Sequence, residues 1–68
     1  MIAKVFIWDN NMVTVFDEQG CQVEEYQGSL AQVKDLILAN CLETTIFKLT
    51  SWTGPTKEIT QAEFKELK

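Results

Sequence analysis

The feature that most constrains the fold of this 68-residue chain is a pair of β-rich segments on either side of Asn10-Asn11. Residues 2–8 and 12–17 are rich in β-branched and aromatic residues, which favour strands. Asparagine tolerates the positive φ that both central residues of a type I′ turn require. The two segments therefore predict a β-hairpin. Its register gives three cross-strand pairs on one face: Trp8 with Val13, Phe6 with Val15, and Lys4 with Asp17.

Both faces of this predicted hairpin are apolar, because side chains alternate along each strand. The face opposite the three pairs holds Ala3, Val5, Ile7, Met12, Thr14 and Phe16. An antiparallel hairpin that is half exposed normally has one apolar face and one polar face. This hairpin needs cover on both sides, and a chain of 68 residues has little material for that purpose.

The composition predicts a single compact domain over residues 1–68, because 46% of the residues are hydrophobic and no linker or repeat divides the chain. No apolar run approaches the ~20 residues that span a bilayer. The N-terminus also lacks the basic region, long apolar segment and cleavage site of a signal peptide. We therefore expect a cytoplasmic protein without membrane association.

Two residue types are missing from the chain, namely arginine and histidine, and the net charge is −4. Without arginine, the chain has no bidentate group for phosphates, and its six lysines are scattered, so nucleic acid is not the expected partner. Without histidine, the commonest metal ligand is absent. Cys21 and Cys41 have no zinc-type spacing and are expected to be free thiols in a reducing compartment. We expect no metal and no cofactor.

The middle of the chain predicts a third strand and a helix. Cys21 to Tyr26 alternate in polarity and are typical of an edge strand. Ser29 and Gln32 form a capping-box pattern, and apolar residues then recur at helical spacing as far as Asn40. An amphipathic helix is therefore expected to begin after Ser29 and to pack on the sheet.

The last third of the chain predicts a strand over residues 43–51, with Phe47 and Leu49 facing the core, and one short extended piece over 57–59. Thr60 and Glu63 form a second capping box, which predicts a short terminal helix. The predicted fold is α+β with the order β-β-β-α-β-α: a three-stranded antiparallel meander, a crossover helix, a fourth strand and a short C-terminal helix. The fourth strand is expected to run parallel to the third.

Catalytic chemistry is not expected from this sequence. The two cysteines lack a histidine partner, and Ser29 and Thr60 are predicted helix caps. The three glycines form no phosphate-binding loop. Adjacent carboxylates such as Glu24 and Glu25 point to opposite sides of a strand and cannot converge on a substrate. The sequence thus predicts a protein that is not an enzyme.

The leading hypothesis is an interaction protein that presents an apolar sheet face to itself, as a homodimer, or to a protein partner. The alternative use of that face is as core beneath a helix. Trp52, next to the Gly54-Pro55 turn, either projects as a binding residue or folds back over the core. The candidate interaction residues are Phe6, Trp8, Val13, Val15 and Trp52.

Two other functions are kept as alternatives. An acidic inhibitor that mimics nucleic acid would need one surface that gathers Asp9, Asp17, Glu18, Glu24, Glu25 and Glu43. Binding by such a surface would collapse with added salt, whereas association through an apolar face would not. A binder of single-stranded nucleic acid by aromatic stacking is the third possibility, but the chain lacks the basic groove that this function uses.

Overall fold

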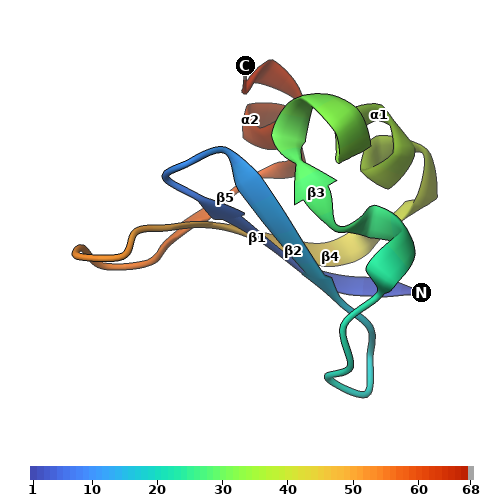
Figure 1. Ribbon diagram of the computed structural model, residues 1–68. Coiled ribbons are helices and arrows are strands. Elements are labelled where there is room, and N and C mark those ends of the chain that lie inside the picture. The colour runs from blue at the N-terminus through green and yellow to red at the C-terminus, as the bar shows by residue number, and fades with distance from the viewer. Residues whose placement is uncertain (68) are drawn as a thin grey trace.

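The computed structural model describes residues 1–67 and has the predicted α+β architecture, with one mixed five-stranded sheet and two α-helices (Figure 1). The elements in chain order are β1 Ile2–Trp8, β2 Met12–Phe16, the 3₁₀ helix η1 Glu24–Tyr26, β3 Gly28–Ser29, α1 Leu30–Asn40, β4 Cys41–Thr50, β5 Lys57–Ile59 and α2 Gln61–Glu66. The order of elements differs from the prediction, because the third strand lies elsewhere and a fifth strand precedes α2.

The sheet has the strand order β3-β2-β1-β4-β5. β1 and β4 pair in parallel at its centre, and the other neighbouring strands are antiparallel. α1 carries the chain from β3 across the sheet to β4. Because β1 and β3 both run antiparallel to β2, β4 has the same direction as β3, although this β3 is not the strand over residues 21–26 to which the sequence analysis expected the fourth strand to be parallel.

The predicted hairpin exists, but its register is shifted by one residue. Val13 lies opposite Ile7, and Val15 opposite Val5. The amide of Asn11 donates to the carbonyl of Trp8 (2.9 Å), and Asn11 alone in the turn has a positive φ, of 63°. The connection is therefore a three-residue loop, a β-turn followed by one left-handed residue, and not a two-residue type I′ turn. A shift of one residue moves every β2 side chain to the other face.

The predicted third strand over residues 21–26 is wrong. Gln22 makes an isolated bridge with Phe16, and Glu24–Tyr26 form η1. The third strand is the two-residue β3, Gly28–Ser29. The polarity alternation in residues 21–26 comes instead from a turn that directs some side chains to the core and others to solvent.

A side chain replaces the missing strand along the outer edge of β2. The side-chain amide of Gln27 donates to the carbonyls of Val15 (3.0 Å) and Val23 (2.8 Å). Gly28 follows with a φ of 139°, a conformation that L side chains rarely adopt. This arrangement lets the chain enter β3 and α1 directly from the edge of the sheet.

α1 begins after Ser29 and ends at Asn40 as predicted, but the expected capping box is absent. The Ser29 side chain makes no capping hydrogen bond. The first amide of the helix, that of Leu30, instead donates to the carbonyl of Asn11 (2.7 Å) in the β1–β2 loop. The helix is thus capped in part by a distant segment, which local sequence does not reveal.

The second capping box is confirmed. The amide of Glu63 donates to Thr60 Oγ1 (3.1 Å), and the amide of Thr60 donates to Glu63 Oε1 (3.3 Å). α2 is held further by Phe64, whose buried ring stacks on that of Phe47 with centroids 4.6 Å apart. Lys34 of α1 also donates a hydrogen bond to the carbonyl of Leu67. These contacts fix a helix that is too short to be stable alone.

The core lies between the sheet and both α-helices, which cover the same face of the sheet (Figure 1). Its buried hydrophobic residues are Ile2, Val5, Ile7, Val13, Val15, Leu30, Val33, Ile37, Phe47, Ile59 and Phe64. The hydroxyl of Thr45 joins the strands at one end, since it donates to the carbonyl of Ile2 (2.7 Å) and accepts from the amide of Leu42 (2.8 Å). Because α2 packs beside α1, no helix within residues 1–67 covers the opposite face of the sheet.

Candidate protein-interaction surface

The sheet face that the helices leave uncovered is the candidate functional site, and we call it the open face. β1, β2 and β4 supply most of it, because the side chains that alternate with the core residues all project to this side. Trp52 joins the face from the β4–β5 loop through its contact with Trp8. The open face consists of Lys4, Phe6, Trp8, Met12, Thr14, Phe16, Ile46, Lys48, Thr50, Trp52 and Glu58.

Two aromatic pairs order the side chains of the open face. Phe6 and Phe16 meet edge to face, with centroids 5.5 Å apart and an interplanar angle of 84°. The indoles of Trp8 and Trp52 stack with centroids 4.5 Å apart and an angle of 25°. Trp8 Nε1 donates to Thr14 Oγ1 (3.0 Å), which fixes its orientation. Ring contacts of this kind preorganise a surface, so little side-chain entropy is lost when a partner binds.

The open face gathers most of the large apolar side chains that this structure exposes. Among residues 1–67, five such side chains are more than a third exposed, and three belong to the open face: Trp52 (67%), Met12 (43%) and Ile46 (36%). A fourth, Met1, lines a shallow hollow with Ile46 and Lys4. The fifth, Leu36, lies on α1 at 44% exposure. Exposed apolar surface is therefore concentrated on one side of the molecule.

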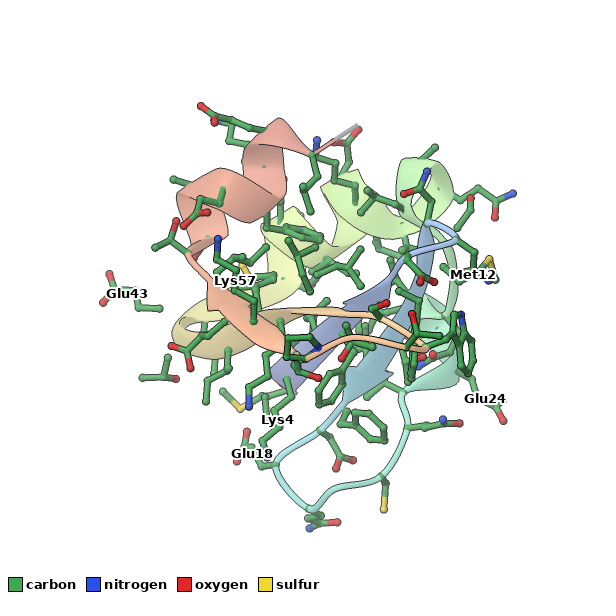
Figure 2. The ribbon with its side chains drawn as sticks, turned by 90° about the vertical axis from the view of Figure 1, so that its left-hand side faces the viewer. Lys4, Met12, Glu18, Glu24, Glu43 and Lys57 are labelled. Atoms are coloured by element: carbon green, nitrogen blue, oxygen red, sulfur yellow. The ribbon has the colours of Figure 1, made fainter. Side chains whose placement is uncertain are left out.

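The charged groups around the open face have mixed sign. Lys48 lies directly opposite Glu58 on the neighbouring strand. Lys4 and Glu18 line a common hollow beside Phe6 and lie near each other at the lower edge of the sheet (Figure 2). Asp17 lines the same hollow, but its Oδ1 accepts hydrogen bonds from two amides of its own turn. Two lysines and three carboxylates therefore give this region a charge of about −1.

Three of the five predicted interaction residues belong to the open face, namely Phe6, Trp8 and Trp52. Val13 and Val15 do not, since they are 2% and 0% exposed in the core, and the prediction for these two residues is corrected. The one-residue register shift is the cause. It also explains why sequence reasoning assigned Met12 and Phe16 to the wrong face.

Trp52 neither projects freely as a binding residue nor folds back over the core, which were the two predicted alternatives. It lies against Trp8, yet it does not cover the core, because two thirds of its surface is exposed. Phe64 and Leu67 do not cover the open face either, since α2 packs on the helical side. Ile46 was not predicted as a site residue, although its alternation with Phe47 was the signal that placed it away from the core.

The carboxylates that were considered as an acidic surface do not form one cluster. Asp17 and Glu18 lie in the turn after β2, Glu24 and Glu25 lie in η1, and Glu43 lies near the start of β4. Figure 2 shows Glu24 and Glu43 at opposite sides of the molecule, with Glu18 at its lower edge. Their arrangement is that of solvated charges distributed over the surface.

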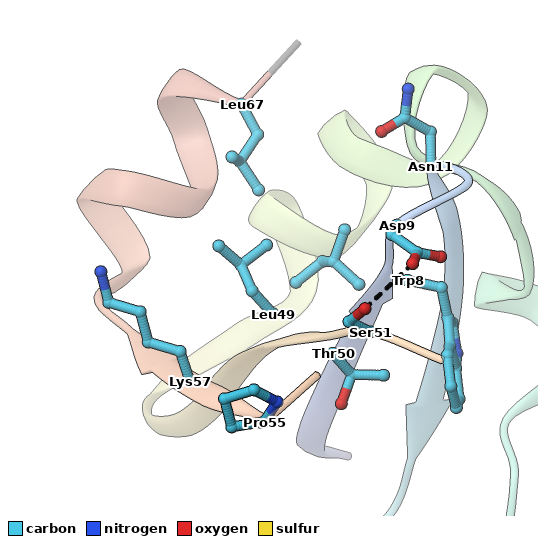
Figure 3. A pocket seen from close by; sticks show the side chains of 10 residues that line it. Trp8, Asp9, Asn11, Leu49, Thr50, Ser51, Pro55, Lys57 and Leu67 are labelled. Carbon is cyan, nitrogen blue, oxygen red and sulfur yellow. Dashed lines mark hydrogen bonds between the residues drawn. The ribbon is translucent and has the colours of Figure 1, made fainter. Parts of the chain in front are cut away.

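A separate hollow of about 340 Å³ opens at the end of the sheet where β1 and β4 finish (Figure 3). Leu49 and Leu67 are among its apolar lining residues, and Ser51 Oγ donates to Asp9 Oδ2 (3.1 Å) at its rim. Lys57 and Asp9 lie on opposite sides of it (Figure 3). Its charged groups therefore do not converge on one point as acid–base catalysis would require.

Comparison with models of protein families, with curated proteins and with solved structures finds no match to this chain. Within residues 1–67, neither helix has the length and hydrophobicity needed to cross a membrane. In the same residues, no group of three or more histidine, cysteine or acidic side chains is positioned to hold a metal ion. Cys21 and Cys41 are free thiols.

Proposed function

We propose that this chain is a small, non-catalytic protein of the cytoplasm that acts by binding a protein surface through its open face. The observation that carries the proposal is the absence of helical cover over a face that contains two aromatic pairs, in the part of the chain that the structure describes. Monomeric soluble proteins rarely gather exposed large apolar side chains on one side without a use for them, and Trp52, Met12 and Ile46 are gathered on the open face. The free thiols of Cys21 and Cys41 fit a reducing compartment.

Aromatic residues support the same proposal by their type. Tryptophan and methionine are enriched at protein interfaces relative to the rest of the surface, and tryptophan is prominent among hot spots. Trp52 and Met12 are exposed on the open face, and Trp8 is held in place below Trp52. An enzyme would instead need groups that converge on a reacting atom, whereas the two lysines of the open face lie apart, Lys4 opposite Phe16 and Lys48 opposite Phe6.

The test compares two lysine substitutions of similar exposure. Ile46→Lys introduces a charge on the open face, and Leu36→Lys introduces the same charge on α1, where Leu36 is 44% exposed. Association is measured in two ways, by the mass of the purified chain in solution and by quantitative capture of proteins from an extract of the cells that produce it. Circular dichroism verifies that both variants fold.

We expect Ile46→Lys to lose an association that the wild type and Leu36→Lys both retain, because burying an unpaired ammonium group is costly. The proposal is wrong if the wild-type chain is a strict monomer that captures no protein. It is also wrong if Ile46→Lys retains every association of the wild type.

A further inference from the structure

We infer that a hollow beside the two tryptophans binds the guanidinium group of an arginine side chain in a polypeptide ligand. The hollow has a volume of about 330 Å³ and lies where Trp8, Trp52 and Met12 meet the edge of the sheet at Gln27 and Gly28. We call it the tryptophan hollow. Its volume is near the lower end of the range of ligand pockets, so it suits a single side chain. The inference goes beyond the proposed function, because one side chain leaves the rest of the open face free.

The tryptophan pair offers an aromatic face to a ligand. The indoles of Trp8 and Trp52 stack with centroids 4.5 Å apart, so each indole covers one face of the other. Trp52 is 67% exposed, which leaves its other face open to solvent. The bond from Trp8 Nε1 to Thr14 Oγ1 (3.0 Å) holds the stack on the sheet before a ligand arrives. The face of an indole is electron-rich and is the best aromatic surface for a cation.

Gln27 adds a hydrogen-bond acceptor to the lining of the tryptophan hollow. Its side-chain nitrogen donates to the carbonyls of Val15 (3.0 Å) and Val23 (2.8 Å), and these two bonds orient the amide group. Within residues 1–67, its side-chain carbonyl oxygen accepts no hydrogen bond, so this acceptor is available to a ligand. A guanidinium group has its N–H donors in the plane of the group, so one group can stack by its face and donate from its edge.

The charges around the tryptophan hollow favour a cation. The residues among 1–67 that line it are all uncharged. Asp9 directly follows Trp8, and its Oδ2 accepts a hydrogen bond from Ser51 (3.1 Å), the residue before Trp52. Glu24 belongs to η1, and Figure 2 shows it on the same side of the molecule as Met12. Carboxylates in these positions raise the local concentration of a cationic ligand.

The lysines of the open face do not supply that cation themselves. Lys4 lies opposite Phe16, at the end of the hairpin that is remote from the turn. Lys48 lies opposite Phe6 on one side and opposite Glu58 on the other, so a carboxylate offsets its charge. The whole chain carries −4, which also attracts a basic ligand.

Arginine fits the tryptophan hollow better than other cations or planar groups do. Guanidinium is planar and weakly hydrated and stacks on aromatic rings, whereas the ammonium group of lysine is a compact, strongly hydrated charge. A nucleobase also stacks on an indole, but its phosphates would meet an acidic chain without a basic groove. The chain has no arginine of its own, so no guanidinium group within it competes for the hollow.

The experiment titrates the purified, isotope-labelled chain with N-acetyl-arginine amide and follows the indole N–H signals by nuclear magnetic resonance. The chain has two tryptophans and both line the hollow, so these signals report on the site directly. Two comparison ligands separate the properties of arginine. N-acetyl-citrulline amide has the same length and a planar end group without charge, and N-acetyl-lysine amide has the charge without the plane.

We expect N-acetyl-arginine amide to shift both indole signals with a dissociation constant in roughly the millimolar range. The citrulline compound should bind at least about fivefold more weakly, and the lysine compound at least about twofold more weakly. Absence of a saturable shift up to roughly 50 mM arginine compound would overturn the inference. Equal binding of the citrulline compound, or of the lysine compound, would overturn it as well.

Two lysine variants test the location of the site. Met12 lines the hollow and Leu36 lies on α1, and their side chains have nearly equal exposures of 43% and 44%. Met12→Lys should weaken binding of the arginine compound by at least about threefold, whereas Leu36→Lys should change it by less than about twofold. Equal weakening by both variants would show that only the net charge matters and would overturn the inference. Circular dichroism verifies both folds, and the three ligands on the wild type decide the matter if a variant does not fold.

Failure of this inference is separable from failure of the proposed function. If the arginine compound does not bind while capture from extract remains sensitive to Ile46→Lys, the inference is wrong and the interaction surface stands. If the arginine compound binds as expected while no protein associates with the open face, the hollow stands and the proposed function is wrong.

Discussion

Replacing Trp52 with alanine separates the two roles that an exposed aromatic residue can have. In a single copy, Trp52 contributes its stacking on Trp8, with centroids 4.5 Å apart, and the burial of about a third of its surface. Such aromatic pairs contribute about 0.5–1.5 kcal/mol beyond area burial. We therefore expect the free energy of unfolding of the monomer to fall by only about 1–2 kcal/mol.

The expected effect of Trp52→Ala on association is larger. The two thirds of Trp52 that one copy exposes become available for burial in the interface. A tryptophan that is a hot spot of an interface typically contributes at least about 2 kcal/mol to the free energy of binding. A loss of about 2 kcal/mol corresponds to a rise of roughly thirtyfold in the dissociation constant.

The assay for this prediction pairs two measurements on the same variant. Urea unfolding of dilute protein gives the stability of the monomer, and sedimentation equilibrium gives the dissociation constant. Leu36→Ala is the matched control, because it removes an exposed apolar side chain from the helical side. The reasoning is refuted if Trp52→Ala changes the dissociation constant by less than about threefold. It is also refuted if the substitution lowers the free energy of unfolding by more than it lowers the free energy of association.

Three further predictions concern the fold and the forces at the interface. Thr45→Val should lower the free energy of unfolding by about 2–3 kcal/mol in urea titrations, because the amide of Leu42 and the carbonyl of Ile2 lose their partner. Thr45→Ser retains the hydroxyl and should therefore retain most of the stability. Glu63→Ala should cost about 1 kcal/mol through the capping box, whereas Glu63→Gln should cost less, and a larger loss for glutamine would contradict the role of Glu63. Raising the salt concentration should leave association through the open face unchanged, whereas weakening by added salt would favour the acidic-inhibitor function instead.

Local sequence signals predicted the elements whose positions in the chain are marked by neighbouring residues. The apolar spacing after Ser29 identified α1 to its last residue, and the capping box of Thr60 and Glu63 identified α2. The alternation around Phe47 identified which side chains of β4 face the core. In each case neighbouring residues in the chain mark where the element lies, so the pattern can be recognised without knowledge of the fold, although distant contacts stabilise both helices.

The register of the hairpin was not readable in this way. A two-residue and a three-residue loop around Asn10 and Asn11 differ by one residue, and both suit asparagine. The choice is determined by the core, because burying Val13 and Val15 under α1 orients β2. The same choice decides which β2 side chains belong to the open face, so Met12 and Phe16 were missed for the reason that Val13 and Val15 were wrongly included.

The sequence also could not predict which face of the sheet α2 covers. Phe64 and Leu67 were equally able to cover either face of a hairpin with two apolar sides. Their position depends on β5, which brings α2 to the sheet edge beside β4, and on the stacking of Phe64 on Phe47. Such long-range contacts decide that one face of the hairpin remains open.

The central claim, that the open face is an interface, has a direct spectroscopic test. The chain has two tryptophans, Trp8 and Trp52, and both lie on the open face, so tryptophan emission reports on this surface alone. Acrylamide quenching is measured from nanomolar to roughly 100 μM protein in reducing buffer. Association through the open face predicts that quenching weakens and emission shifts to the blue as concentration rises, in step with the mass. Quenching that stays constant while the mass rises would contradict association through the open face.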